Sequence, residues 1–216
     1  RLLSKHTSPG LLLDVGAAAG FILEGFRSSG WRVRGLEPNP RMAALANERL
    51  GQVVTTGTLE EWTSDEAFDV VVMIQVISHL RDLRRGLEAA AARTKPGGLW
   101  LVETWNRESW TARAFGRRWH EYSPPSVLHW FSPDGLRHAC ERFGFLEVTR
   151  GRPTKWLDFG HARSLLRFKL GQGAAGSIAR PFLAVLPDHF RLPYPGDDLF
   201  WMLLRKSGGE TSPPGS

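Results

Sequence analysis

Residues 11–20 read Leu-Leu-Leu-Asp-Val-Gly-Ala-Ala-Ala-Gly, and this stretch decides the fold of the chain. Branched apolar residues give way to small ones, which is typical of a buried parallel strand that turns sharply into a helix. Gly16 and Gly20, with Ala18 between them, keep side chains away from the turn, so a ligand can lie against the backbone. Because α/β folds bind nucleotides at such turns, the sequence predicts a nucleotide-like ligand here.

Acidic residues at the ends of two predicted strands indicate which nucleotide is bound. The small residues at 16, 18 and 20 are followed by Phe21, which departs from the G-x-G-x-x-G spacing of dinucleotide sites. A carboxylate at Asp14 would repel a pyrophosphate and attract a cationic ammonium group. Glu37, 21 residues after Gly16, ends a strand-like run and can accept both ribose hydroxyls. This pair favours S-adenosylmethionine, a cationic adenosyl compound, over NAD.

Further apolar runs alternate with amphipathic segments, which predicts an α/β fold. Strands are expected at 31–36, 52–56, 68–74, 99–104, 145–150 and 199–204, and helices at 21–29, 39–50, 82–94 and 132–143. The segment 105–130 is rich in Trp, Arg and His without a steady period, so we interpret it as an active-site loop or lid.

Several of these segments, taken in order, resemble the class I S-adenosylmethionine-dependent methyltransferases. They are residues 11–21, Glu37-Pro38, and the block from Phe68-Asp69-Val70-Val71-Val72 to Lys95-Pro96-Gly97-Gly98. The run from Phe131-Ser132-Pro133 to Gly144-Phe145 is similar to the subgroup near the ubiquinone O-methyltransferases and the methyltransferases of sugars and natural products. The resemblance implies a doubly wound, seven-stranded Rossmann-like sheet, mostly parallel with an antiparallel last strand, and helical lid insertions.

The resemblance also implies a set of cofactor-binding residues: Asp14, Gly16, Ala17, Ala18, Gly20, Phe21, Glu37, Pro38, Thr58, Leu59, Gln75 and Val76. Some of these positions depart from the family pattern, since Thr58 stands where relatives often carry Asp. Ser78 likewise replaces the Glu of a Val-x-Glu-His-Leu motif, while His79 is retained. The strand 68–74 lacks the Asp at its tip that holds magnesium in catechol-type relatives, so we predict no metal.

Methyl transfer from a sulfonium requires alignment of donor and acceptor and exclusion of water, and a base assists when the acceptor is a hydroxyl. The candidate bases are His79, Glu103 and His120. Each has an alternative interpretation: His79 caps a helix or packs on the cofactor, Glu103 pairs with an arginine of the lid, and His120 is a surface or packing residue. The products expected are a methylated small-molecule acceptor and S-adenosylhomocysteine.

Length and composition predict one methyltransferase domain over residues 1–206, in which 105–131 and 151–190 form lid or substrate-cap segments, followed by a disordered tail at 207–216. A single Cys, and the lack of a signal segment or of about 18 consecutive apolar residues, predict a cytoplasmic protein. The chain begins with Arg1 close to the first strand, which suggests that an N-terminal helix is missing.

The charge of +6 and the isoelectric point of about 10.1 raise the question of nucleic acid as a partner. The arginines are spread over several segments, and the proline-clamped tip of nucleic-acid amino methyltransferases is absent after residue 74. We therefore favour O-methylation of a sugar, natural product, quinone or lipid-linked hydroxyl over an RNA methyltransferase or a non-catalytic cofactor-binding relative. The apolar residues between Lys155 and Leu186 predict either a substrate cap or peripheral contact with a membrane surface.

Overall fold

The computed structural model describes residues 2–153, 156–158, 191–193 and 197–208. The chain forms two units, one of residues 1–152 with 197–216 and the other of residues 153–196. In the second unit, β7 (Trp156–Asp158) pairs antiparallel with β8 (Arg191–Pro193). The predicted cap 151–190 and tail 207–216 fall largely outside the described residues, and the single-domain assignment stays a prediction.

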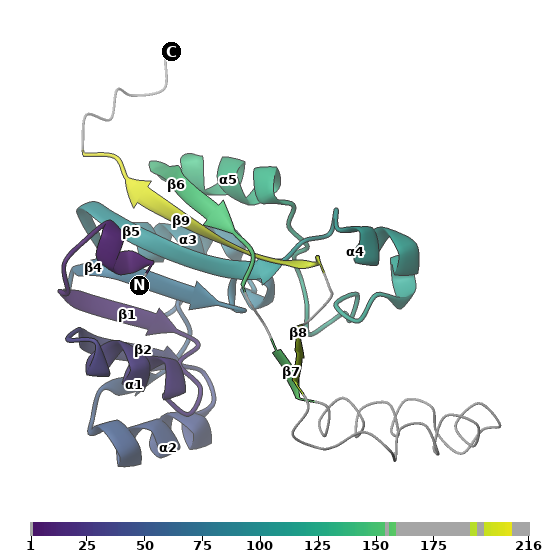
Figure 1. The fold of residues 1–216 in the computed structure, drawn as a ribbon. Coiled ribbons are helices and arrows are strands. Elements are labelled where there is room, and N and C mark those ends of the chain that lie inside the picture. Colours follow the sequence, from purple (N-terminus) through teal and green to yellow (C-terminus); the bar gives the residue numbers. More distant parts are fainter. Residues whose placement is uncertain (1, 154–155, 159–190, 194–196, 209–216) are drawn as a thin grey trace. The chain divides into compact units, whose positions relative to one another are not determined.

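The first unit is built around a seven-stranded sheet with helices on both sides (Figure 1). Its strands are β1 (Leu11–Val15), β2 (Arg32–Glu37), β3 (Val54–Thr56), β4 (Phe68–Ile74), β5 (Thr94–Trp105), β6 (Phe145–Gly151) and β9 (Leu199–Lys206). Its helices are α1 (Phe21–Ser28), α2 (Pro40–Leu50), α3 (Leu83–Ala92), α4 (Trp110–Phe115) and α5 (Pro133–Glu141), with 3-10 turns η1 (Leu3–Lys5), η2 (Ile77–His79) and η3 (Gly116–Arg118).

The strand order β3-β2-β1-β4-β5-β9-β6 is that of a doubly wound fold. The first five strands in this order run parallel, and β9 lies antiparallel between β5 and β6. The predicted mostly parallel sheet with an antiparallel last strand is therefore confirmed. Because the carboxyl ends of β1, β2 and β4 meet at one edge, this edge is where the order of strands allows a ligand to bind.

The central strands send alternate side chains to two separate apolar layers, as their period of two requires. On one face, Leu12 and Val70 pack with Leu23 of α1 and with the apolar side of α2. On the other face, Leu13 and Val71 pack with the apolar sides of α3 and α5. Burial on both faces explains why these strands read as continuous apolar runs in the sequence.

The lid predicted at 105–131 contains more regular structure than its composition indicated. It includes the short helix α4 and the turn η3, and Asn106 bridges Phe131 so that its two ends lie together. Trp119 is buried within it, whereas Trp110 is exposed. No helix in the described part of the chain has the length and apolar character needed to cross a bilayer.

Gly35 in β2 leaves room for side chains of α1 and of the neighbouring strand β3. A Cβ at this position would lie 2.8 Å from the Leu23 side chain, 2.8 Å from that of Val54 and 2.9 Å from Ala17 Cβ. Real Cβ atoms essentially never approach other atoms so closely. The absence of a side chain here thus sets the spacing between the first helix and the sheet.

Alanine at Gly35 should therefore destabilise the protein by about 1 to 3 kcal/mol, because the new methyl group overpacks this junction. The matched control is Gly25→Ala at an exposed position of α1, where nothing lies within 4 Å of an added Cβ. There, alanine should stabilise the helix by about 0.5 to 1 kcal/mol. Urea unfolding of both variants measures the two free energies, and equal stability of Gly35→Ala and the parent protein would contradict this packing.

Candidate active site

The turn between β1 and α1 is shaped by backbone geometry that few residues other than glycine adopt. Gly16 and Gly20 have φ angles of 73° and 79°, and Gly20 is the N-cap of α1. A Cβ at Gly16 would lie 2.5 Å from Val76 Cγ2, so the turn and the end of β4 touch here. Ala18 also adopts a left-handed conformation, with φ of 46°, which is costly for a residue with a side chain.

Glu37 fixes this turn from the end of β2. Its Oε2 accepts a hydrogen bond from the Ala18 backbone N–H at 2.8 Å, and its Oε1 accepts one from Asn39 N–H at 2.9 Å. The residue is 8% exposed. Each carboxylate oxygen has a second lone pair, so Glu37 retains the capacity to accept hydroxyl groups of a ligand.

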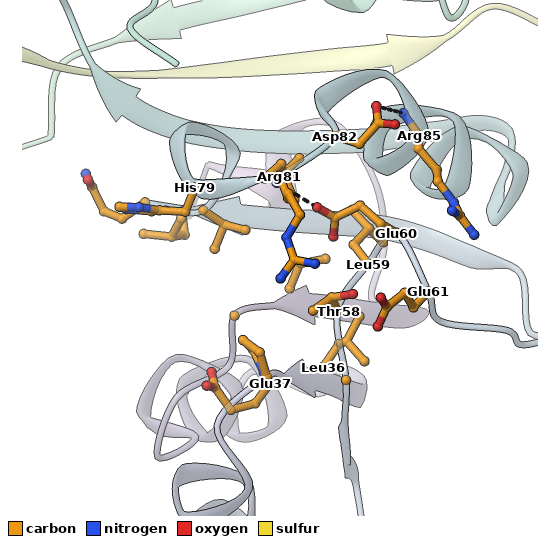
Figure 2. Close-up of a pocket in the computed structure, with 18 residues that line it drawn as sticks. Leu36, Glu37, Thr58, Leu59, Glu60, Glu61, His79, Arg81, Asp82 and Arg85 are labelled. Atoms are coloured by element: carbon orange, nitrogen blue, oxygen red, sulfur yellow. Dashed lines mark hydrogen bonds between the residues drawn. The ribbon is translucent and has the colours of Figure 1, made fainter. Parts of the chain in front are cut away.

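A cavity of about 730 Å³ opens at the carboxyl ends of β1, β2 and β4 (Figure 2). Figure 2 shows that its wall is formed by Glu37 at the end of β2, by Thr58 after β3, and by His79 and Arg81 after β4. Of the residues predicted to bind cofactor, the cavity is lined by Gly16, Glu37, Pro38, Thr58, Leu59, Gln75 and Val76. Such a size and such a position are typical of a small-molecule site in an α/β sheet.

The other predicted cofactor residues do not line the cavity: Asp14, Ala17, Ala18, Gly20 and Phe21. Ala17 is buried beneath the turn, whereas Phe21 is 70% exposed with the Arg49 guanidinium 4.1 Å from the centre of its ring. Ala18 is exposed and Gly20 is buried at the start of α1. Their roles toward a cofactor stay predictions.

Asp14 lies behind the wall of the cavity, in the middle of the sheet. It pairs in register with Gly35 and Val72, is 1% exposed, and its Oδ2 has no hydrogen-bond partner among the described residues. Burial, and secondarily the negative charge of Glu37, raise the pKa of Asp14 to about 7. A cationic ligand in the adjoining cavity would favour the ionised carboxylate, which is the electrostatic role predicted for this residue.

Among the candidate bases, only His79 lines the cavity. Its Nδ1 lies 2.5 Å from the carbonyl oxygen of Ser126, so Nδ1–H donates and Nε2 carries the lone pair of the neutral ring. Glu103 instead accepts a hydrogen bond from the Gln75 amide at 3.1 Å through Oε1. The expected pairing of Glu103 with a lid arginine stays untested.

His120 lies at a different place, where the segment after β5 meets the start of β9. Its Nε2 is 3.5 Å from Glu121 Oε1 and its Nδ1 is 4.0 Å from Asp198 Oδ2. The imidazole also packs edge-on against Trp105, with ring centres 4.7 Å apart. His120 and His79 therefore do not share the cavity.

The cavity also contains charged residues that sequence reasoning did not select, namely Glu60, Glu61, Arg81, Asp82 and Arg85. Glu60 accepts a hydrogen bond from Arg81 N–H at 2.9 Å, which ties the loop after β3 to the residues before α3. Asp82 caps α3 by accepting from Arg85 N–H. The capping pattern was visible in the sequence, but the Glu60 contact joins segments with no shared motif.

A family model described as a methyltransferase domain matches residues 1–150. The chain belongs to this family. The prediction of a class I S-adenosylmethionine-dependent methyltransferase is confirmed at this level, and S-adenosylmethionine is the cofactor that the family assignment brings with it. The departures at Thr58 and Ser78 thus occur within a member of the family.

Ubiquinone biosynthesis O-methyltransferases are among the similar curated proteins. The one from Nitrobacter winogradskyi is 31% identical over 170 residues, covering 71% of this chain and 63% of the relative. The one from Bradyrhizobium sp. is 34% identical over 151 residues, covering 68% and 55%. The methyltransferase domain thus spans only part of the length of these relatives.

A solved structure from Thermotoga maritima shares the fold. It is described as an S-adenosylmethionine-dependent methyltransferase and possible histamine N-methyltransferase, with a TM-score of 0.63 and 22% identity. The alignment covers 95% of this chain and 86% of that one. At this identity the likeness confirms the Rossmann-like fold of the methyltransferase domain.

The elevated pKa of Asp14 gives the ligand-free protein a pH-dependent stability. The folded state holds this proton up to a pH of about 7, whereas the unfolded chain releases it near 3.8. Between these values the folded state binds more protons, so the unfolding free energy falls as the pH rises. The loss is complete above the folded-state pKa.

Asp14→Asn should remove this dependence, because the amide stays neutral. Relative to the variant, the parent protein should lose about 2 to 3 kcal/mol of unfolding free energy between about pH 5 and about pH 8. Urea unfolding at both pH values measures the difference. Parallel pH profiles for the two proteins would contradict the assignment of the buried proton to Asp14.

Proposed function

We propose that this methyltransferase domain transfers a methyl group from S-adenosylmethionine to a hydroxyl of a small, quinone-related molecule. The observation that carries the proposal is that one cavity is lined both by Glu37 and by His79. The first residue is suited to a ribose and the second to the proton of a hydroxyl. The names of the similar curated proteins support the acceptor class.

The residues around the cavity fit the cofactor. Glu37 would hold the ribose hydroxyls through the lone pairs that Ala18 and Asn39 leave available. Thr58 and Leu59 line the same wall and would contact the adenine. The buried, unpartnered oxygen of Asp14 would be stabilised by a cation in the cavity. When bound, S-adenosylmethionine supplies a methyl group already activated on a sulfonium.

His79 would act as the general base. Its Nε2 would take the proton of the acceptor hydroxyl, whose oxygen would receive the methyl group that bound S-adenosylmethionine supplies, with S-adenosylhomocysteine as the leaving group. The imidazolium that results keeps its hydrogen bond to the Ser126 carbonyl. Glu103 and His120 lie outside the cavity lining, which favours His79 over them for this step.

An RNA substrate and a non-catalytic role remain the alternatives, and both are outcomes of the same assay. Peripheral membrane contact was predicted for residues 155–186, which lie almost wholly outside the described part of the chain. A lipid-linked acceptor would be consistent with a quinone-related substrate.

Incubation with methyl-labelled S-adenosylmethionine should transfer label to a short-chain prenylated catechol and not to total RNA. A glycoside and a polyketide phenol complete the panel of hydroxylated acceptors, and mass spectrometry identifies the methylated oxygen. Label in RNA alone would overturn the proposal. Binding of S-adenosylhomocysteine without labelling of any acceptor would favour the non-catalytic alternative.

His79→Gln should lower turnover of the labelled acceptor by about 10²- to 10⁴-fold, which is the usual contribution of a general base. The affinity for S-adenosylhomocysteine, measured by calorimetry, should change little, because the cofactor contacts lie with Glu37 and its neighbours. The control is His138→Gln on the exposed side of α5, which should leave turnover unchanged. Unaltered turnover in His79→Gln would exclude this residue as the base.

A further inference from the structure

Four hydrogen bonds fasten residues 126–129 onto the turn that carries His79. The Ser78 carbonyl accepts from Leu128 N–H at 2.9 Å and from His129 N–H at 3.2 Å. The Leu80 carbonyl lies 2.8 Å from His129 Nε2, and the Ser126 carbonyl lies 2.5 Å from His79 Nδ1. Each of the two segments therefore has one imidazole that hydrogen-bonds to a backbone carbonyl of the other segment.

Both imidazoles are constrained by the chemistry of their partners. A carbonyl oxygen can only accept a hydrogen bond, so His79 must carry hydrogen on Nδ1 and His129 must carry it on Nε2. In neutral His79 the lone pair then lies on Nε2, for which no partner is found among the described residues. The reverse tautomer would place a lone pair against the Ser126 oxygen and would leave Nε2 unable to take a proton.

The Ser126 carbonyl must be held in place to accept the hydrogen bond from His79, because Ser126 itself is exposed. The residues after it are anchored by the buried Val127 side chain, by the two N–H groups that bind the Ser78 carbonyl, and by the half-buried ring of His129. On the other side, the Ser126 hydroxyl donates to the Ser123 carbonyl at 3.0 Å. Of these, the contact from His129 is the one made to the residue directly after His79.

We propose that His129 is a positioning residue for the methyl transfer. By binding the Leu80 carbonyl, it holds the Ser126 carbonyl against His79 and so fixes the tautomer whose Nε2 can accept the hydroxyl proton. This inference rests on the proposed function of His79 as base. The same carbonyl also stabilises the imidazolium that forms, because a hydrogen bond donated by a charged group is stronger than one from a neutral group.

Nitrogen-15 NMR of the imidazole rings tests the tautomer without a substrate. The full chain, labelled at histidine and saturated with S-adenosylhomocysteine at about pH 8, where histidine is mostly neutral, should show His79 protonated at Nδ1. His79→Gln assigns the signal. His129→Leu removes the donor and should shift His79 toward the Nε2–H tautomer, whereas His129→Gln, whose amide can replace the Nε2–H donor, should retain Nδ1–H.

Turnover of the prenylated catechol supplies the second measurement. His129→Leu should lower kcat about tenfold, the scale of one lost hydrogen bond, with the affinity for S-adenosylhomocysteine unchanged, and His129→Gln should restore most of the rate. His138→Gln is the matched control for both measurements. If His129→Leu fails to fold, His129→Asn replaces it, because the asparagine amide is too short to reach the Leu80 carbonyl.

Two results would overturn the inference. One is Nε2–H on His79 in the parent protein, and the other is an unchanged Nδ1–H tautomer in a folded His129 variant that lacks the donor. A failure of the proposed function looks different: the tautomer responds to His129 as expected, but His79→Gln leaves methyl transfer unchanged. The NMR and the assay together therefore separate the two.

Discussion

Two carboxylates on neighbouring strands are almost completely removed from water: Glu37 at the end of β2, and Asp14 one residue before the end of β1. Glu37 compensates for its burial with two backbone hydrogen bonds, whereas one oxygen of Asp14 has no partner among the described residues. Burial of an unpaired charge is costly, and the raised pKa of Asp14 is the consequence. A cation bound in the cavity would reduce that cost. The buried Asp14 therefore lowers the stability of the ligand-free fold and provides a site suited to a positively charged ligand.

Carboxylate-bearing residues also support the strained backbone around the cavity. Ala18 and Gln75 are the non-glycine residues with positive φ in the described part of the chain, at 46° and 60°. Glu37 binds the N–H of Ala18 through its side chain, and Glu103 binds the N–H and side-chain amide of Gln75 through its carbonyl and Oε1. Such conformations persist only where neighbouring contacts hold them. In both cases a glutamate on one strand, β2 or β5, holds the turn that follows the neighbouring strand, β1 or β4.

The sequence predicts the frame of this site well, because strand ends and helix caps are local patterns. The seven strands of the sheet, the helix expected at 39–50 and the place of Glu37 follow from apolar runs and turn residues. What the sequence could not provide is which of these side chains reach the cavity. Glu37 ends β2 and lines the cavity, whereas Asp14 lies one residue before the end of β1 and does not line it. Contacts such as Glu103 with Gln75 depend on register between strands, which no local pattern encodes.

The segment after β5 is a second case in which the sequence does not reveal the contacts that define the structure, because hydrogen bonds to distant residues hold it in place. Its composition predicted a lid, yet it is fastened at both ends of its path. Asp197 accepts from Trp110 and Thr111 N–H at the start of α4, and Asp198 accepts from the Trp119 indole at 3.0 Å. At the other end, residues 126–129 form hydrogen bonds with the turn that carries His79.

His120 belongs to the first of these attachments, since it lies between Asp198, Glu121 and Trp105. Its contacts favour a role in holding the segment to β9 over one in proton transfer. The two attachments differ in what they fix: the contacts with Asp197 and Asp198 set where the segment starts, and those at 126–129 set the orientation of a single imidazole. A segment without periodicity can therefore be as well defined as the sheet, because tertiary hydrogen bonds replace the regular pattern that it lacks.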